Sequence, residues 1–224
     1  LAGLLIAGAI PGVLVPHDPY KINARDRLLP PSRAHLLGTD DRGRDILARI
    51  IHGTRVSVAA ALALVALAAV VGSAVGLVAG YAGGRTDELV MRAADVFLSF
   101  PQLILAIGVV TALGRGVMNC VLALSLVWWA QYARLMRGQV LVLREKEFVV
   151  AARALGQRHR GILVHHLLPN AVAPVLVKAT VDMGLAIIFL SALSFLGLGV
   201  QPPDPEWGSM IALGRKYLLD YWWY

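Results

Sequence analysis

The chain has 224 residues and a net charge of +7, from 21 Lys and Arg against 14 Asp and Glu. Apolar residues make up 58% and charged residues only 16%, against about 25% charged in a typical globular protein, and the mean hydropathy is +0.67. This composition excludes collagen and a disordered chain, and the single cysteine excludes a disulfide scaffold. Long uncharged stretches separate the basic residues, which is typical of a protein in a lipid bilayer rather than one that binds nucleic acid.

Five uncharged stretches predict the membrane spans. Residues 56–84, 96–114, 116–133 and 183–203 carry no charged side chain over 29, 19, 18 and 21 residues. A helix needs about 20 apolar residues to cross the bilayer, and about 17 can suffice. Residues 1–16 are also uncharged, and we interpret them as the outer part of another span, with a peripheral anchor as the alternative. We therefore predict a single transmembrane domain over residues 1–224, with spans at about 1–16, 56–80, 94–114, 117–137 and 170–199.

Residues 17–55 form a long polar loop, with proline concentrated near its start. Charged and polar residues recur three or four apart at its end, and isoleucine and leucine take the opposite side: Arg42, Asp45, Arg49 and His52 against Ile46, Leu47, Ile50 and Ile51. This spacing predicts an amphipathic helix that ends at Gly53 and lies in the membrane interface. The alternative is that the segment simply leads into the next span. Residues 81–92 are expected to form a short turn.

The loop at 134–170 is strongly basic, with seven Lys and Arg against Glu145 and Glu147. Helix-forming residues fill 147–155, and Gly156 is expected to end that helix with a left-handed cap. A polar turn at 157–160 follows, and Pro169 is expected to mark the return to the membrane. The small residues Ala151 and Ala152 suit a helix that docks closely on a partner; the alternative is a hairpin that rests on its own protein. Charge alone does not orient the chain, because residues 17–55 also hold eight Lys and Arg.

The same loop carries a family motif. Ala151-Ala152, then Gly156, then His166-Leu-Leu-Pro169 resembles the EAA motif (E-A-A-x3-G-x9-I-x-L-P) of ABC importer membrane subunits. The chain departs from that motif at Val150, where the motif has Glu, and at His166, where it has Ile.

Three further strings resemble the dipeptide, oligopeptide and nickel branch of that family. They are Leu37-Gly-Thr-Asp-Asp-Arg-Gly-Arg-Asp45, Ser194-Phe-Leu-Gly-Leu-Gly-Val-Gln-Pro-Pro203 and Pro205-Glu-Trp-Gly208. The four matches in order cover most of the chain.

The resemblance implies an all-α integral membrane fold, a polytopic helical bundle of the type I ABC importer permease kind. Such subunits have six spans with both ends in the cytoplasm, so five spans would lie in this chain and a sixth would follow Tyr224. The resemblance places a helical coupling loop, 138–169, in the cytoplasm, and it places the loop 17–55 and the segment 200–224 outside. The location implied is the bacterial inner membrane.

The implied function is that of a pore subunit of an ATP-driven importer, with short peptides as cargo. The chain would be no enzyme and would bind no cofactor, because ATP and Mg²⁺ would sit on two cytoplasmic ATPase subunits. A second homologous permease and an external substrate-binding protein would complete the system. Alternatives are an importer of nickel or another small solute, a stand-alone channel or secondary transporter, and an intramembrane enzyme, although no Walker A, G-x-S-x-G or H-E-x-x-H string is present.

The resemblance assigns ATPase coupling to a set of residues in the loop: Glu147, Ala151, Ala152, Leu155, Gly156, Arg158, His159, Arg160, Leu168 and Pro169.

The sequence identifies the residues that line the translocation path less specifically than those of the coupling loop. Lys178 and Asp182 stand four apart, so they can pair on one helix face, and ionisable groups inside a span often face a water-filled path. Together with Met183 they are the path candidates, although Lys178 can also reach the interface. Asp95 is expected to pair with Arg92. Pro101 and Pro174 are expected to bend their helices.

Metal binding is not expected from the six histidines. His17, His35, His52 and His159 are scattered over the loops, and the adjacent His165 and His166 point about 100° apart on a helix. No Cys/His cluster of metal-site spacing occurs in the sequence.

Overall fold

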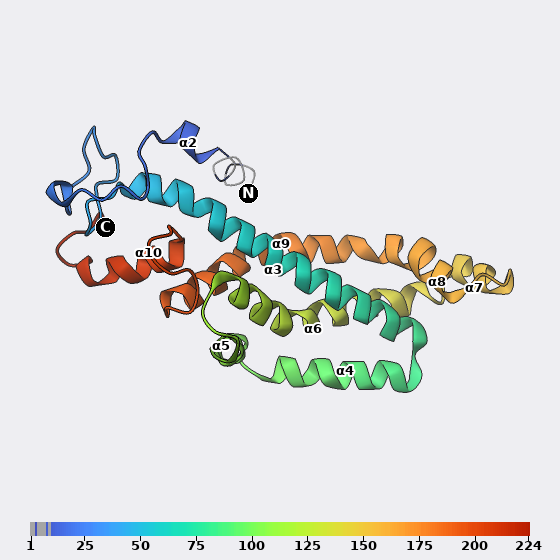
Figure 1. The fold of residues 1–224 in the computed structure, drawn as a ribbon. Coiled ribbons are helices and arrows are strands. Elements are labelled where there is room, and N and C mark those ends of the chain that lie inside the picture. Colours follow the sequence, from blue (N-terminus) through green and yellow to red (C-terminus); the bar gives the residue numbers. More distant parts are fainter. Residues whose placement is uncertain (1–2, 4–7, 9) are drawn as a thin grey trace. The chain divides into compact units, whose positions relative to one another are not determined.

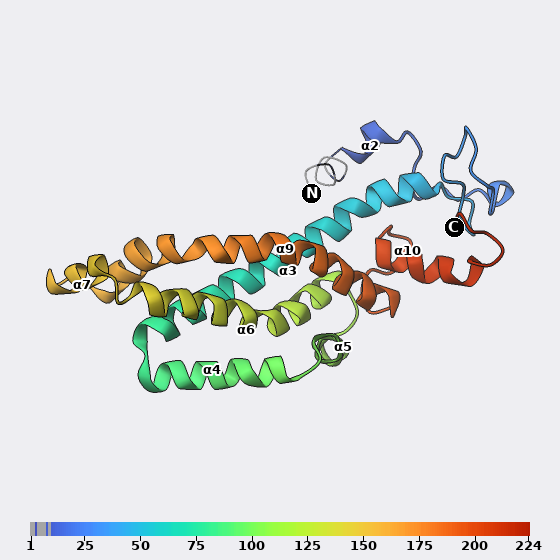
Figure 2. The ribbon, with the colours of Figure 1, turned by 180° about the vertical axis from the view of Figure 1, so that it is seen from behind.

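In the computed structural model, residues 3, 8 and 10–224 are described, and within them the chain is helical with no β-strand (Figures 1 and 2). A single β-bridge joins Thr39 and Asp45. The elements are α2 (Pro11–Leu14), the 3-10 turn η1 (Ala24–Asp26), α3 (Ile46–Ala82), α4 (Gly84–Ser99), α5 (Gln102–Leu113), α6 (Val117–Leu143), α7 (Glu147–Ala154), α8 (His159–Gly161), the π-helical segment η2 (Ile162–Leu167), α9 (Leu168–Phe195), α10 (Trp207–Gly214) and the 3-10 turn η3 (Arg215–Tyr217). The predicted all-α class is confirmed.

The chain divides into two compact units. The first unit combines Leu1–Leu62, Val110–Val121 and Ile187–Tyr224, and the second combines Ala63–Val109 and Leu122–Ala186.

Within the part of the chain that the structure describes, two helices are long and apolar enough to cross a membrane. They are Ile46–Ala82 and the continuous helix His159–Phe195, each of 37 residues. A third span is possible if α4 and α5 count as one, although the pair is bent by 94°. The predicted span at 56–80 lies inside the first helix, and most of the one at 170–199 lies inside the second. Residues 1–2, 4–7 and 9 of the span predicted at 1–16 lie outside the described residues, and the total of five stays a prediction.

The helix at the end of the polar loop differs from its prediction. It does not stop at Gly53, because α3 runs unbroken from Ile46 to Ala82, so the alternative of a lead into the span is confirmed. Gly53 has no positive φ, and its missing side chain instead lets Pro205 and Trp207 approach: a Cβ there would lie 3.4 Å from both residues. The glycine therefore serves close packing within the first unit.

The predicted turn at 81–92 is also wrong, because the reversal is confined to Gly83 and Gly84, with φ of +66° and +52°, and α4 already starts at Gly84. A true break comes later, at Phe100 and Pro101. Phe100 is extended, with φ −91° and ψ +144°, as expected for the residue before a proline. Pro101 thus separates two helices rather than bending one.

A row of glycines on α3 brings its backbone against α6 in the second unit. A Cβ on Gly72 would lie 2.3 Å from the carbonyl oxygen of Trp129, and one on Gly76 would lie 2.2 Å from that of Ala133. Small residues at this spacing let helices in a bilayer pack closely, where apolar side chains alone give little driving force.

Ion pairs hold α4 to α6 in the same unit. Arg137 donates to both carboxylate oxygens of Asp87 at 2.6 Å, and Arg134 pairs with Asp95. The expected Asp95–Arg92 pair is therefore wrong, because Arg92 pairs with Glu88 one turn away on its own helix.

The string 37–45 forms a compact turn in the first unit, immediately before α3. Gly38 and Gly43 have positive φ, and Asp40 accepts hydrogen bonds from the backbone and Nε of Arg44. Asp40, Arg44 and Arg49 are all at most 2% exposed. Arg49 also donates to the carbonyl oxygens of Pro19 and Pro203, which ties the start of the loop to the C-terminal segment.

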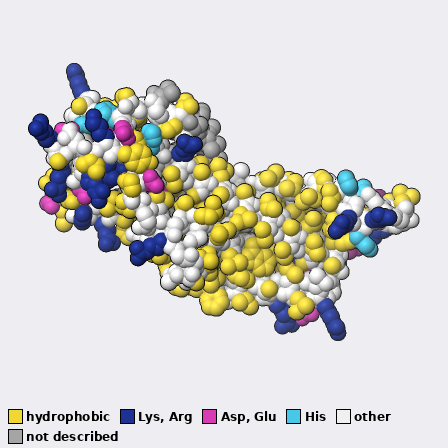
Figure 3. Space-filling view, viewed as in Figure 1, with side chains coloured by type: hydrophobic (Ala, Val, Ile, Leu, Met, Phe, Trp, Pro, Cys, Tyr) yellow, Lys and Arg dark blue, Asp and Glu magenta, His cyan; other side chains and the backbone are white. Residues whose placement is uncertain are grey.

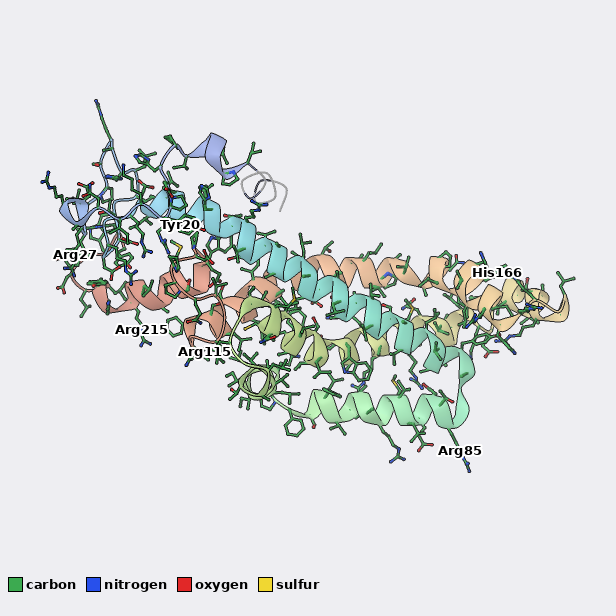
Figure 4. The ribbon with its side chains drawn as sticks, in the orientation of Figure 1. Tyr20, Arg27, Arg85, Arg115, His166 and Arg215 are labelled. Atoms are coloured by element: carbon green, nitrogen blue, oxygen red, sulfur yellow. The ribbon has the colours of Figure 1, made fainter. Side chains whose placement is uncertain are left out.

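The string 205–208 starts α10. Glu206 caps this helix by accepting from the amides of Gly208 and Ser209 at 2.8 Å, and Trp207 donates to the carbonyl oxygen of Ile50. Tyr20, near the start of α3 in Figure 4, donates to Asp204 at 3.2 Å. Burial, with Asp204 nearby, raises the pKa of the Tyr20 phenol, so the phenol stays a neutral donor.

Candidate functional site

The loop between α6 and α9 contains the predicted helix and its predicted end. α7 runs from Glu147 to Ala154, and Gly156 follows with a φ of +76°. The amide of Gln157 donates to the carbonyl oxygen of Ala152 at 3.1 Å, and that of Gly156 to Arg153 at 2.9 Å. This pair of bonds is a Schellman motif, which satisfies carbonyls that a helix end leaves free. The left-handed cap at Gly156 is confirmed.

The chain returns as one helix from His159 that includes Pro169, so the proline does not start this helix, and where the helix enters the membrane stays a prediction. Instead, Ile162–Leu167 widens into a π turn directly before this proline. A proline ring crowds the carbonyl four residues earlier, here that of His165, and removes one amide donor. The wider turn accommodates both effects.

The inner face of the loop rests on its own protein. Val149 and Ala152 of α7 and Ile162 and Leu167 of the π segment are buried. Polar contacts fix the turn between them: His166 Nε2 lies 2.8 Å from Gln157 Oε1.

A second set of contacts joins the turn to the end of α3. His159 Nδ1 lies 2.8 Å from the hydroxyl of Tyr81, and the guanidinium of Arg153 stands 5.2 Å from the centre of the Tyr81 ring. α7 and α8 form a tip at one end of the second unit, beside the labelled His166 (Figure 4). The tip is therefore held in a defined shape.

The outer face of this tip is exposed and partly apolar. Leu155 is 88% exposed, and Phe148, Val150 and Val164 are 41%, 51% and 53% exposed. Ala151, Glu147 and Pro169 are exposed as well.

The turn after α7 adds basic side chains to this face. Arg158, His159 and Arg160 are exposed, and Figure 3 shows basic and histidine side chains gathered at this end. The packed inner face agrees with a hairpin that rests on its own protein, and docking of the exposed outer face on a partner stays a prediction.

The three path candidates lie inside the second unit. Lys178 Nζ is 2.9 Å from Asp182 Oδ2, so the pairing on one helix face is confirmed. Tyr132 donates its hydroxyl to Asp182 at 2.7 Å, and Lys178 also donates to Gln131. Asp182 and Met183 are each 4% exposed. The network joins α9 to α6, and contact with cargo stays a prediction.

One cluster escaped the sequence reasoning. His17 and His35, expected to be scattered, have ring centres only 5.3 Å apart in the first unit, and both face Asp45. Their irregular spacing on a loop without regular structure gave no signal of this.

Comparison with known proteins identifies the family. Residues 72–219 match the family described as binding-protein-dependent transport system inner membrane component. A probable D,D-dipeptide transport system permease protein of Escherichia coli K12 is 44% identical over 211 residues, covering 94% of this chain and 71% of that protein.

Two further relatives are nearly as similar. A dipeptide transport system permease protein of Alkalihalophilus pseudofirmus is 43% identical over 90% of this chain and 66% of its own length. A nickel transport system permease protein of E. coli K12 is 43% identical over 91% and 74%. The chain therefore belongs to the family of binding-protein-dependent transport system inner-membrane components, as a non-catalytic permease subunit of an importer in the inner membrane.

Proposed function

We propose that this subunit lines one half of the pore, and that residues 147–169 transmit movement to it from a cytoplasmic ATPase subunit. The exposed outer face of the tip carries the proposal. Leu155, at 88% exposure, stands on a loop whose inner face is packed, and exposed apolar residues on a rigid support are typical of a protein interaction site.

The remaining parts of the machine are proposed from the family. A second homologous permease completes the pore, two ATPase subunits bind ATP and Mg²⁺, and an external binding protein delivers cargo. This chain itself binds no cofactor for transport. Closure of the ATPase pair on ATP pulls the coupling helices together and rocks the spans from inward-open to outward-open.

Short peptides are the proposed cargo, because two of the similar permeases are named for dipeptides. Nickel is the second candidate, because an equally similar permease is named for it. Uptake of a labelled dipeptide and of radioactive nickel by the same reconstituted complex separates the two.

Gly156→Glu tests the coupling role. We expect the full-length subunit to insert and assemble, but substrate-stimulated ATPase activity to be abolished, because the side chain strains the cap and adds a charge beside Leu155. Gly156→Asn is the matched control, since asparagine tolerates the left-handed conformation. Gly138→Ala, on an exposed face of α6 with no atom within 4 Å of a new Cβ, controls for glycine loss as such. Normal stimulation in Gly156→Glu contradicts the proposal.

A further inference from the structure

Three side chains of the kinds that bind metal ions meet at the start of α3 in the first unit. His35 Nδ1 lies 2.9 Å and His17 Nδ1 lies 3.9 Å from the same oxygen, Oδ2 of Asp45. One ligand-type atom from each residue falls within 4.8 Å of the other two. They come from three separate positions of the polar loop, so the fold rather than the sequence brings them together.

Asp45 is held in a fixed orientation. Its residue is 5% exposed, and its other oxygen, Oδ1, accepts from the amide of Ala48 at 2.7 Å in the first turn of α3. Because this capping bond fixes the carboxylate, Oδ2 remains directed at the two imidazoles. Hydrogen bonds of this kind around a ligand set its direction in known metal sites.

His35 is also positioned by its backbone. Its amide donates to Ser32 Oγ at 3.1 Å, and its carbonyl oxygen accepts from the amides of Ser32 and Gly38. The side chain of His17 is 45% exposed, against 16% for His35. Two ligands are thus preset, and the third approaches from the solvent side.

A cavity of about 240 Å³ opens directly beside the cluster. Its lining includes Asp18, Asp26 and Asp45 with a single lysine, Lys21. Three carboxylates against one ammonium favour a cation there, and the space admits water molecules that complete a coordination shell.

We propose that His17, His35 and Asp45 bind a divalent transition-metal ion of the Zn²⁺ or Ni²⁺ class. Two imidazole nitrogens and one carboxylate oxygen are a common ligand set for such ions. Bonds of about 2.0–2.2 Å at tetrahedral angles separate ligand atoms by about 3.3 Å, which lies between the 2.9 and 3.9 Å found here. A metal ion bound at His35 Nδ1 and Asp45 Oδ2 takes the place of the direct contact between these two atoms. The ion staples residues 17 and 35 to the first turn of α3, whatever cargo the importer carries.

Metal titration of the purified full-length complex, with any affinity tag removed, tests the site. Equilibrium dialysis against Zn²⁺ and Ni²⁺ should show one ion per chain, and Co²⁺ should give the visible absorption of a nitrogen- and oxygen-ligated ion. His17→Ala and Asp45→Asn should each weaken binding by more than about 100-fold, because loss of a mere supporting partner already costs about 10- to 100-fold.

The variants are chosen to leave the fold intact. Asparagine at residue 45 retains an oxygen for the capping bond to Ala48, and His17 is half exposed. His52→Ala is the matched control: His52 lines a neighbouring cavity with His17 but is not one of the three clustered ligands. Absence of saturable binding, or equal affinity in His17→Ala and wild type, overturns the proposal and leaves a hydrogen-bonded His35–Asp45 pair only. Neither outcome bears on the ATPase test of the coupling loop.

Discussion

Gly43 in the first unit and Gly156 in the second have almost the same left-handed backbone, with φ of +73° and +76°, but opposite surroundings. A Cβ on Gly43 would lie 1.8 Å from the carbonyl oxygen of Asn23, whereas one on Gly156 would meet no atom within 4 Å. One glycine is enclosed by its own chain and the other protrudes from it. The polar loop before α3 is thus packed against itself, whereas the tip formed by α7 and α8 leaves its glycine uncovered by the chain's own atoms.

Charges follow the same contrast. Arg44 and Arg49 of the first unit are buried around Asp40, whereas Arg158 and Arg160 of the second are exposed. Buried charges require their partners within the protein. Exposed charges such as those of Arg158 and Arg160 are solvated and do not require such partners.

The largest effect is expected from alanine at the enclosed glycine. Gly43→Ala should lower the free energy of unfolding by about 3 kcal/mol or more, from backbone overlap added to left-handed strain. Gly156→Ala should cost only the strain, about 1–2 kcal/mol. Thermal unfolding of the full-length chain in detergent measures both losses, and protease cleavage within residues 17–45 reports separately on Gly43→Ala. Equal losses for the two variants would remove the contrast between the regions.

A smaller effect is expected inside the second unit. Asp182→Asn should destabilise by about 1–3 kcal/mol, because the Lys178 ammonium loses its carboxylate partner in a largely buried setting. Lys178→Met in the same chain should recover part of the loss. The thermal midpoint gives the stability, and transport at a temperature well below it tests the path role. Transport unchanged in folded Asp182→Asn excludes cargo contact at this carboxylate.

The smallest effect is expected at the surface of α4. Arg92 and Glu88 pair at 2.6 Å, but their side chains are 74% and 59% exposed. Arg92→Ala should therefore change the free energy of unfolding by less than about 0.5 kcal/mol. A larger loss in the same thermal assay means that Arg92 contacts a group outside this chain. Arg85→Ala, at the start of α4 (labelled in Figure 4), is the control for removal of an arginine from this helix.

Local signals were sufficient for the coupling loop. Helix-forming residues followed by Gly156 predict both α7 and its left-handed end, because each depends on neighbours in the sequence. The length of the helix at the start of α3 was harder to predict. Glycine is common at helix ends, but Gly53 lies inside α3 and is buried against Pro205 and Trp207. Only the folded chain shows that contact.

Sequence patterns failed where contacts are long-range. Pro101 is an exception, because the extended Phe100 before it is a local effect, but the result is two helices at 94° rather than the single bent helix that the sequence predicts. The His17, His35 and Asp45 cluster has no spacing rule, because a loop closed by the Gly38 and Gly43 turns brings its members together. The pairing of Asp95 with Arg134 rather than Arg92 likewise depends on the packing of α4 on α6.

The π turn before Pro169 makes the helix tolerant of a change in length at this point. Such a turn holds one more residue than an α turn, whereas one extra residue in a regular α-helix would rotate everything beyond it by about 100°. Because the wider turn absorbs its extra residue locally, deleting one residue from 162–167 would restore an α turn and leave His159 and Arg160 facing nearly the same way relative to the rest of α9. A difference of one residue in length at this point is therefore compatible with an unchanged tip.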